Sequence, residues 1–309
     1  MTVYKNFIST IFLILLLMPY WSQEKVLLIT HSCKYPEFIK LQCNSFKTFL
    51  KDDYEFVVFN DATSPQIKSE IEATCNQLGI KTVSIPQEIH ALPYLPREAR
   101  DNFNAANVRH ANCIQYSFDS LGFSYNGYVC LIDSDVFLIR KFSISNYMKN
   151  KDIAAFVKYA PQGIYCLCPV LCIFDMPNLP DKNSINFNCG RINGWPVDSG
   201  GYTYFYLKNH PNIRLDKITS LYSHQLFLAD AHFNRLADTL PTEVKEAFYT
   251  SLGFNKNEIN FLIKKPDTFE FYLDCNFIHY RGGSTDGKSL EQSYKFKIFK
   301  EFLDGLTNF

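Results

Sequence analysis

Short apolar runs alternate with amphipathic segments through the first third of the chain. Runs of strand length occupy residues 25–30, 54–59 and 81–85. Between them, helical spacing places apolar side chains at Phe38, Leu41, Phe46 and Leu50, and a second helix is expected over residues 67–78. Regular alternation of strands and helices predicts a doubly wound sheet that is largely parallel.

The most informative segment is residues 128–137, Tyr-Val-Cys-Leu-Ile-Asp-Ser-Asp-Val-Phe. Its continuous apolar run predicts a strand buried on both faces, and ligands of such sheets collect at the carboxyl ends of strands. If the segment stays extended, Asp133 and Asp135 point the same way. Two carboxylates on one side make a site for a divalent cation, which can hold a diphosphate. The alternative is that these aspartates only form a turn or a cap.

The helix expected over residues 97–121 has an unusual upstream end. Its apolar stripe, Ala111, Ile114, Phe118 and Leu121, extends back through Asn107 and close to Asn104 and Arg100. Polar groups on a buried stripe need partners. These three residues therefore face a ligand, or they form a solvated helix start.

The second half of the chain predicts strands at residues 153–159 and 164–174 and a last helix over residues 290–306. Residues 177–196 are irregular and contain Trp195, and long loops of this kind tend to be functional. The sequence Asp198-Ser199-Gly200-Gly201 follows, and residues 202–207 read as a helix start or a strand. Further on, Gln225 opens an apolar segment and His279 ends another.

Composition narrows the class of protein. The 309 residues suffice for one large α/β domain or two small ones, and 47% are apolar. Lys plus Arg equals Asp plus Glu, at 31 each, so no basic field drives nucleic-acid binding and that partner is set aside.

Residues 7–21 are almost wholly apolar, with Lys5 in front. This length is typical of a signal peptide and short for a membrane span, but the cleavage site is poor. Residues 1–22 are therefore expected to be a signal peptide or an N-terminal anchor that associates with the membrane through residues 5–21. The protein is then exported or membrane-anchored, and cytoplasmic if the segment is no signal. Residues 24–309 form the expected domain.

The ten cysteines leave the redox compartment open. Cys130 lies within the apolar run and is expected to be an inert small hydrophobe. Cys166, Cys168 and Cys172 do not have the spacing of a zinc site. Disulfides are expected only if the chain is exported.

Taken in order, these features resemble the GT-A family of nucleotide-sugar glycosyltransferases. The order is a β-α-β opening, Asn60-Asp61 after the second strand, a polar-tipped helix, Asp133-Ser134-Asp135, the Asp198–Gly201 segment, and a late His279 followed by glycines. The resemblance spans nearly the whole chain after residue 24. It implies a Rossmann-like mixed central sheet flanked by helices, and a glycosyltransferase that moves a sugar, expected to be a hexose, from a nucleotide-diphosphate donor, with a UDP-sugar favoured, to a glycan or other hydroxyl acceptor.

The resemblance also implies site residues. Asp133, Asp135 and His279 would bind Mn²⁺ or Mg²⁺. Asp198 would be the base or would bind sugar hydroxyls, with Gln225 near the anomeric carbon. The remaining donor-binding residues would be Thr30, His31, Asn60, Asp61, Arg100, Asn104, Asn107, Ser134, Gly200, Gly201, Gly282 and Lys288.

The chain departs from the glycogenin-like branch, in which the histidine is followed by Gly and Lys-Pro-Trp. Gly282 fits that pattern, but the tripeptide is absent, and Arg281 or Lys288 would supply the phosphate-binding charge. Two other classes stay open. Haloacid-dehalogenase-like phosphatases carry Asp-x-Asp after an apolar strand, but near their N-terminus. A non-catalytic exported carbohydrate-binding protein could share the fold.

Overall fold

The structure is a computed structural model, and it describes residues 25–91, 105–222, 242–251, 253–264, 270–280 and 294–307. Within them, the largest sheet has seven strands in the order β10-β6-β7-β4-β1-β2-β3. Its parallel half contains β1 (Val26–Ser32), β2 (Tyr54–Asn60), β3 (Lys81–Ser84) and β4 (Tyr128–Ile132). β7 (Ile164–Asp175) runs antiparallel to β4 and to β6 (Ile153–Ala160), and β10 (Leu215–Ile218) is parallel to β6. This confirms the expected mixed central sheet.

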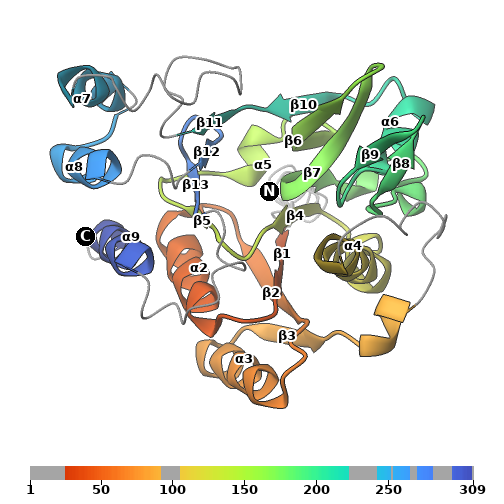
Figure 1. Cartoon of the computed structure of the whole chain (residues 1–309), viewed down its shortest axis with the longest axis horizontal. Coiled ribbons are helices and arrows are strands. Elements are labelled where there is room, and N and C mark those ends of the chain that lie inside the picture. The colour runs from red at the N-terminus through yellow and green to blue at the C-terminus, as the bar shows by residue number, and fades with distance from the viewer. Residues whose placement is uncertain are drawn as a thin grey trace, which may run out of the picture.

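Helices cover both faces of this sheet (Figure 1). α2 (Pro36–Phe49) and α3 (Pro65–Leu78) lie on one face, and α4 (Ala105–Ser117) lies on the other. Because side chains alternate along β1, Val26 and Leu28 join the core under α2 and α3, whereas Leu27 and Ile29 join the core under α4. The apolar runs of the sequence are continuous because both faces of their strands are buried.

Most expected elements form within a few residues of their predicted bounds. α3 begins after Ser64, whose hydroxyl caps the amide of Ile67, and ends at Gly79 in the left-handed conformation at φ 68°. α4 continues as one wide turn, Phe118–Gly122, while the upstream part of that expected helix lies outside the described residues. Residues 202–207 contain a helix, α6 (Thr203–Asn209).

The loop expected over residues 177–196 is more ordered than its composition predicts. It contains single helical turns at Met176–Asn178 and Lys182–Ser184, and then the hairpin of β8 (Gly190–Ile192) and β9 (Trp195–Val197). Ile192 and Val197 bury this hairpin against Ile164 and Tyr202. The prediction of an irregular segment is therefore wrong for its last third.

A second sheet was not foreseen from the sequence. Its strands have the order β11-β12-β13-β5: β11 (Ser220–Tyr222), β12 (Glu270–Tyr272), β13 (Phe277–His279) and β5 (Val136–Leu138). Every pairing in it is antiparallel. A third core joins β5, β12 and β13 to α2 and to three helices, α7 (Thr242–Ser251), α8 (Lys256–Lys264) and α9 (Tyr294–Thr307). Short helical segments at Gln87–Ala91 and α5 (Ile144–Tyr147) complete the described elements.

Two expectations about the chain as a whole meet different outcomes. All ten cysteines are free thiols, and nine of them are buried, so no disulfide forms. The expected signal peptide or anchor lies outside the described residues. In the part of the chain that the structure describes, no helix has both the length and the apolar character to cross a membrane.

Candidate functional site

Asp133 and Asp135 lie where the chain passes from the large sheet to the small one. β4 ends at Ile132 and β5 begins at Val136, so the two aspartates belong to the connection. The connection is a turn, closed by the amide of Val136, which donates to the carbonyl of Asp133 over 3.1 Å. The expectation of an extended segment is therefore wrong, because this hydrogen bond bends the chain between the two carboxylates.

His279 reaches this turn through the pairing of β13 with β5. Its partner across the two strands is Val136, and the amide of Tyr280 donates to the carbonyl of Asp135 over 2.8 Å. This register places His279 Nε2 at 3.1 Å from Asp135 Oδ1. One ligand atom each from Asp133, Asp135 and His279 lies within 4.8 Å of the others. We call these three residues the cation triad.

The imidazole of His279 is oriented from its other side by β12. Glu270 Oε2 lies 3.4 Å and the Tyr272 hydroxyl 3.3 Å from Nδ1. A partner on Nδ1 fixes the orientation of the ring and leaves Nε2 directed at Asp135. Sequence reasoning missed Glu270. The available signal was an acidic residue between Phe269 and Phe271, which a buried strand tolerates only with a partner.

The charged groups of the triad shift one another's pKa. Burial lowers the pKa of His279, but attraction to Asp135 and hydrogen bonds to Asp135 and Glu270 outweigh it and raise that pKa to about 10. The pKa of Asp133 is raised by burial and by the charge of Asp135. Burial also raises the pKa of Glu270, but His279 outweighs it and the net shift is downward. Two carboxylates thus lie close together, with His279 and His110 as the positive charges that lower the pKa of Asp133.

The triad fits a divalent cation on its chemistry and spacing. Carboxylate oxygens with one imidazole nitrogen suit Mn²⁺ and related metals. Metal–ligand bonds of about 2.0–2.6 Å allow two ligands of one ion to lie up to about 5 Å apart, and the 4.8 Å limit meets this requirement. A cation would also relieve the repulsion between the two carboxylates.

Asp198 shares the neighbour His110 with Asp133, and its carboxylate is already paired within the protein. Its Oδ2 accepts a hydrogen bond of 3.0 Å from Lys158 on β6, and its Oδ1 accepts one of 2.8 Å from the amide of Ser199. Burial raises the pKa of Asp198, but Lys158 outweighs burial and the net shift is downward. His110 of α4 lies 3.3 Å from the Ser199 hydroxyl, and its charge lowers the pKa of both Asp198 and Asp133. Sequence reasoning missed Lys158 and His110.

The glycines after Ser199 are required by the protein's own packing. Gly200 has φ +82°, and a Cβ there would lie 2.1 Å from the carbonyl of Leu167. A Cβ on Gly201 would lie 2.3 Å from the side chain of Val197. The contacts that require these glycines are with β7 and β9. The predicted contact of Gly200 and Gly201 with the donor stays a prediction.

The residues predicted for the nucleobase and ribose lie at the ends of β1 and β2, and each makes different contacts within the protein. Asn60 braces the loop into α3, donating to the carbonyl of Lys68 and accepting from the amide of Ala62. The Thr30 hydroxyl is fully buried and has no hydrogen-bond partner among the described residues. His31 Nε2 lies 3.1 Å from the Ser117 hydroxyl, and burial together with His110 lowers the pKa of His31 to about 3. His31 is thus neutral.

Asp61 is the centre of a second polar cluster. Arg109 donates to its two carboxylate oxygens over 2.6 and 2.7 Å, and His90 Nε2 lies 2.8 Å from Oδ1. Ligand atoms of Asp61, His90 and Cys113 lie within 4.8 Å of one another, and we call these three residues the Asp61 cluster. The pKa of Cys113 is raised by burial and by Asp61, so its thiol is neutral. Arg109 already supplies the positive charge that a metal would bring.

Of the other predicted site residues, two lie within the described part of the chain and five lie outside it. Ser134 lies in the turn, and Asn107 lies in the first turn of α4, half-buried. Arg100, Asn104, Gln225, Gly282 and Lys288 lie outside the described residues, so their predicted roles stay predictions.

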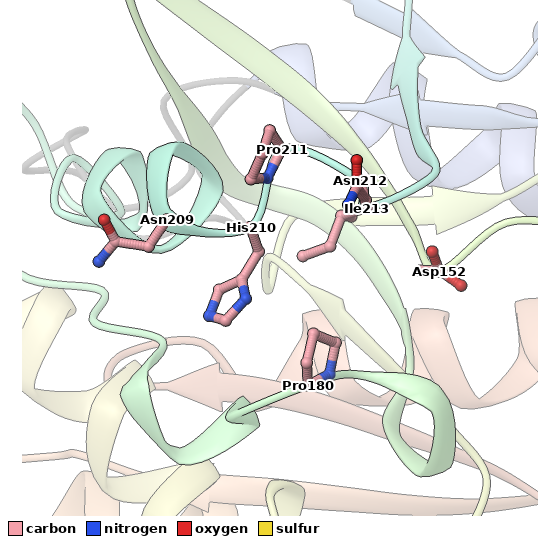
Figure 2. Close-up of a pocket in the computed structure, with 7 residues that line it drawn as sticks. All are labelled: Asp152, Pro180, Asn209, His210, Pro211, Asn212 and Ile213. Carbon is pink, nitrogen blue, oxygen red and sulfur yellow. The ribbon is translucent and has the colours of Figure 1, made fainter.

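A separate cavity of about 230 Å³ lies at the opposite end of the strands (Figure 2). Asp152 lines it and precedes β6, whose first residue pairs with Phe174 near the end of β7. The same end of β7 pairs with the start of β4, whereas the triad follows the end of β4. In the figure the His210 ring points toward Pro180. This cavity is therefore not part of the triad site.

No protein-family model and no curated protein sequence matches the chain. Solved structures similar to it include an apo form of the bifunctional glycosyltransferase WbbM, at 12% identity and TM-score 0.46, covering 93% of this chain and 50% of that one. A mannosyltransferase from Pyrobaculum calidifontis in complex with GDP-Man and Mn²⁺ has 11% identity and TM-score 0.41, covering 64% and 55%. Core-mannan synthase A from Aspergillus fumigatus, in a Mn/GDP form, has 10% identity and TM-score 0.36, covering 52% and 62%.

The matched region thus spans only half to about three fifths of each of those structures. At these identities and TM-scores the likeness does not determine the function. The function is therefore argued from the chemistry of the site.

Proposed function

We propose that the protein is a metal-dependent glycosyltransferase of the GT-A type, which moves a sugar from a nucleotide-diphosphate donor to a glycan or other hydroxyl acceptor. The observation that carries this proposal is the convergence of Asp133, Asp135 and His279 at the carboxyl end of β4. Ligands of open α/β sheets bind at such ends. A nucleotide-sugar is a ligand whose diphosphate matches a divalent cation held there.

The chain's residues would divide the work between the two ends of the donor. Asp133, Asp135 and His279 would hold Mn²⁺ or Mg²⁺, which when bound acts as a Lewis acid on the diphosphate oxygens. Glu270 and Tyr272 keep His279 Nε2 directed at the site. Donors that are already in place stabilise developing charge without reorganising.

For Asp198 the geometry supports one of the two roles that the sequence left open. A carboxylate whose pKa is lowered by Lys158 is a poor proton acceptor. It is a good acceptor of hydrogen bonds from sugar hydroxyls. We therefore assign Asp198 to sugar binding. Trp195, which is 41% exposed and lies three residues earlier on β9, supports an acceptor platform beside it.

The nucleoside would lie over the ends of β1 and β2, near Thr30, His31, Asn60 and Asp61, with Asn107 of α4 facing the same side. The test is the affinity of Asp61→Ala for UDP and GDP. We expect weaker binding of at least one nucleotide, and unchanged binding of both would remove Asp61 from the site.

The decisive experiment is a donor screen with Mn²⁺ that measures released nucleotide, starting with UDP-hexoses. Turnover should require the cation and should be lost in Asp135→Asn while the fold is intact. Full activity in excess EDTA would contradict the mechanism. Hydrolysis of simple phosphate esters without a nucleotide-sugar would indicate a phosphatase, and glycan binding without turnover would indicate a non-catalytic protein.

Export or membrane attachment through residues 5–21 remains part of the proposal. Fractionation of cells that express the full chain and a variant lacking residues 1–22 would test it. The same distribution of both forms would contradict it.

A further inference from the structure

The turn that carries Asp133 and Asp135 is held by a buried side chain of α2. Gln42 is fully buried, and its Nε2 donates to the carbonyls of Asp133 and Val136 over 2.8 and 2.9 Å. These contacts of Gln42 are with the backbone of the turn and not with the carboxylates. Gln42 therefore contacts the turn from the face of the sheet that α2 covers.

These two carbonyls belong to the first and last residues of the turn. The amide of Val136 also donates to the carbonyl of Asp133, so the turn closes on itself and Gln42 ties both of its ends to α2. From the other side, the amide of Tyr280 holds the carbonyl of Asp135. The backbone that carries both carboxylates is therefore fixed from two elements at once.

Stability alone does not account for an amide at this position. Gln42 Oε1 is buried and has no hydrogen-bond partner among the described residues. An unpaired buried oxygen costs about 1–3 kcal/mol. The neighbouring α2 residues Ile39, Cys43 and Phe46 are core residues, so an apolar side chain would suit the surroundings. What the amide adds is two donors aimed at the turn.

We propose that Gln42 is a positioning residue for the cation triad. By tying both ends of the turn to α2, it holds the carboxylates of Asp133 and Asp135 at a spacing that one divalent cation can bridge. This inference rests on the proposed function, because it needs the triad to bind a cation. Residues that orient metal ligands from outside the ligand set typically change metal affinity by about 10–100-fold.

The test compares Gln42→Met with Ser45→Ala. Methionine has nearly the volume of glutamine but no donor. Ser45 is the matched control, because it is also buried on α2 and donates to a backbone carbonyl of β5, that of Leu138, beyond the turn. Mn²⁺ affinity is measured without nucleotide, by electron paramagnetic resonance of the free ion. Unfolding midpoints in urea are measured alongside.

We expect about 10–100-fold weaker Mn²⁺ binding in Gln42→Met and wild-type binding in Ser45→Ala. Donor turnover in Gln42→Met should recover as Mn²⁺ is raised, which general damage to the fold would not produce. If Gln42→Met does not fold, Gln42→Asn replaces it, since its shorter side chain cannot reach both carbonyls, and the same loss is expected.

Two failures are distinguishable. Wild-type protein that binds no Mn²⁺ would defeat the proposed function. Wild-type protein that binds Mn²⁺, together with a folded Gln42 variant that binds it equally well, would overturn the positioning role and leave the function standing.

Discussion

Two regions of the molecule each bring together three side chains of the kinds that bind metals, but the charged groups that surround the two sets differ. In the cation triad, two carboxylates face one imidazole. In the Asp61 cluster, one carboxylate already receives two hydrogen bonds from Arg109 and one contact from His90, beside a neutral thiol. The distances within the two groups meet the same 4.8 Å limit, so distance does not separate them.

Charge balance does separate them. A buried carboxylate needs an opposite charge or several donors. Arg109 meets that need for Asp61 with a bidentate pair, whereas Asp133 and Asp135 lie against each other, with His279 in contact with Asp135. The comparison teaches that distance between ligand-type residues does not by itself predict a metal, and that the charges around them have to be compared as well. Variants of the cation triad and of the Asp61 cluster test whether the two groups differ in metal binding and in stability.

The largest expected effect is that of Asp135→Asn. Removing this carboxylate should lower turnover by roughly 1,000-fold, because a bound cation contributes several kcal/mol to the departure of the diphosphate. Mn²⁺ binding, measured by calorimetry, should weaken at the same time. Asp61→Asn is the matched control and should bind Mn²⁺ like the wild type. Loss of Mn²⁺ binding in Asp61→Asn, with retention in Asp135→Asn, would reverse the two assignments.

A large effect on stability is expected at the other cluster. Arg109→Met leaves a buried carboxylate without its main partner, which costs about 3 kcal/mol in the free energy of unfolding. Lys81→Met is the control, because Lys81 pairs with Glu55 at 3.6 Å on the surface, and such a pair contributes at most about 1 kcal/mol. Urea unfolding at pH 7 measures both. Equal stability of the two variants would show that Asp61 does not depend on Arg109.

How far the sequence could predict this site depends on the range of the interactions. Asp133 and Asp135 could be placed because a local apolar run predicts β4, and the run ends at Ile132. The reason first given for their convergence, an extended segment, was wrong, since the turn depends on hydrogen bonds from Val136 and from the distant Gln42. A local pattern cannot show a partner that lies on another element.

The second sheet shows the same limit more strongly. β5, β12 and β13 have three residues each, too few for a periodic signal. The register that joins His279 to Val136 connects positions separated by about half the length of the domain. His279 was placed through a family resemblance, while Glu270, which orients it, was missed. Asp61 was expected to be open to a ligand, because the sequence does not reveal that Arg109 reaches it.

A smaller effect, of opposite sign, is expected when the triad is relieved of charge. In Mn²⁺-free protein, Asp133→Asn removes the half-buried one of two adjacent carboxylates. Burial together with the charge of Asp135 already disfavours the charged form of Asp133 by raising its pKa. We expect a gain of about 0.5–2 kcal/mol in the free energy of unfolding, the usual range for relieving a functional site. The exposed Asp53→Asn should change stability by less than about 0.5 kcal/mol. Destabilisation by Asp133→Asn in EDTA would show that the triad is balanced without a cation.

The smallest effect concerns a carboxylate–guanidinium pair that is more exposed than that of Asp61. Arg214 donates to Asp152 through Nε, Nη2 and its backbone amide, and the Arg214 side chain is 53% exposed. Hydrogen bonds from Arg214 hold the pKa of Asp152 below its usual value of 3.8, although burial opposes them. Because the folded pKa is below the unfolded one, the pair's contribution to stability is present above about pH 4 and is lost as the pH falls through the folded pKa. The unfolding midpoints of wild type and Asp152→Asn should therefore differ slightly at pH 7 and converge below pH 4. A difference that stays constant down to pH 3 would show that Asp152 acts through its shape rather than its charge, and that exposed and buried pairs in this protein do not follow one electrostatic rule.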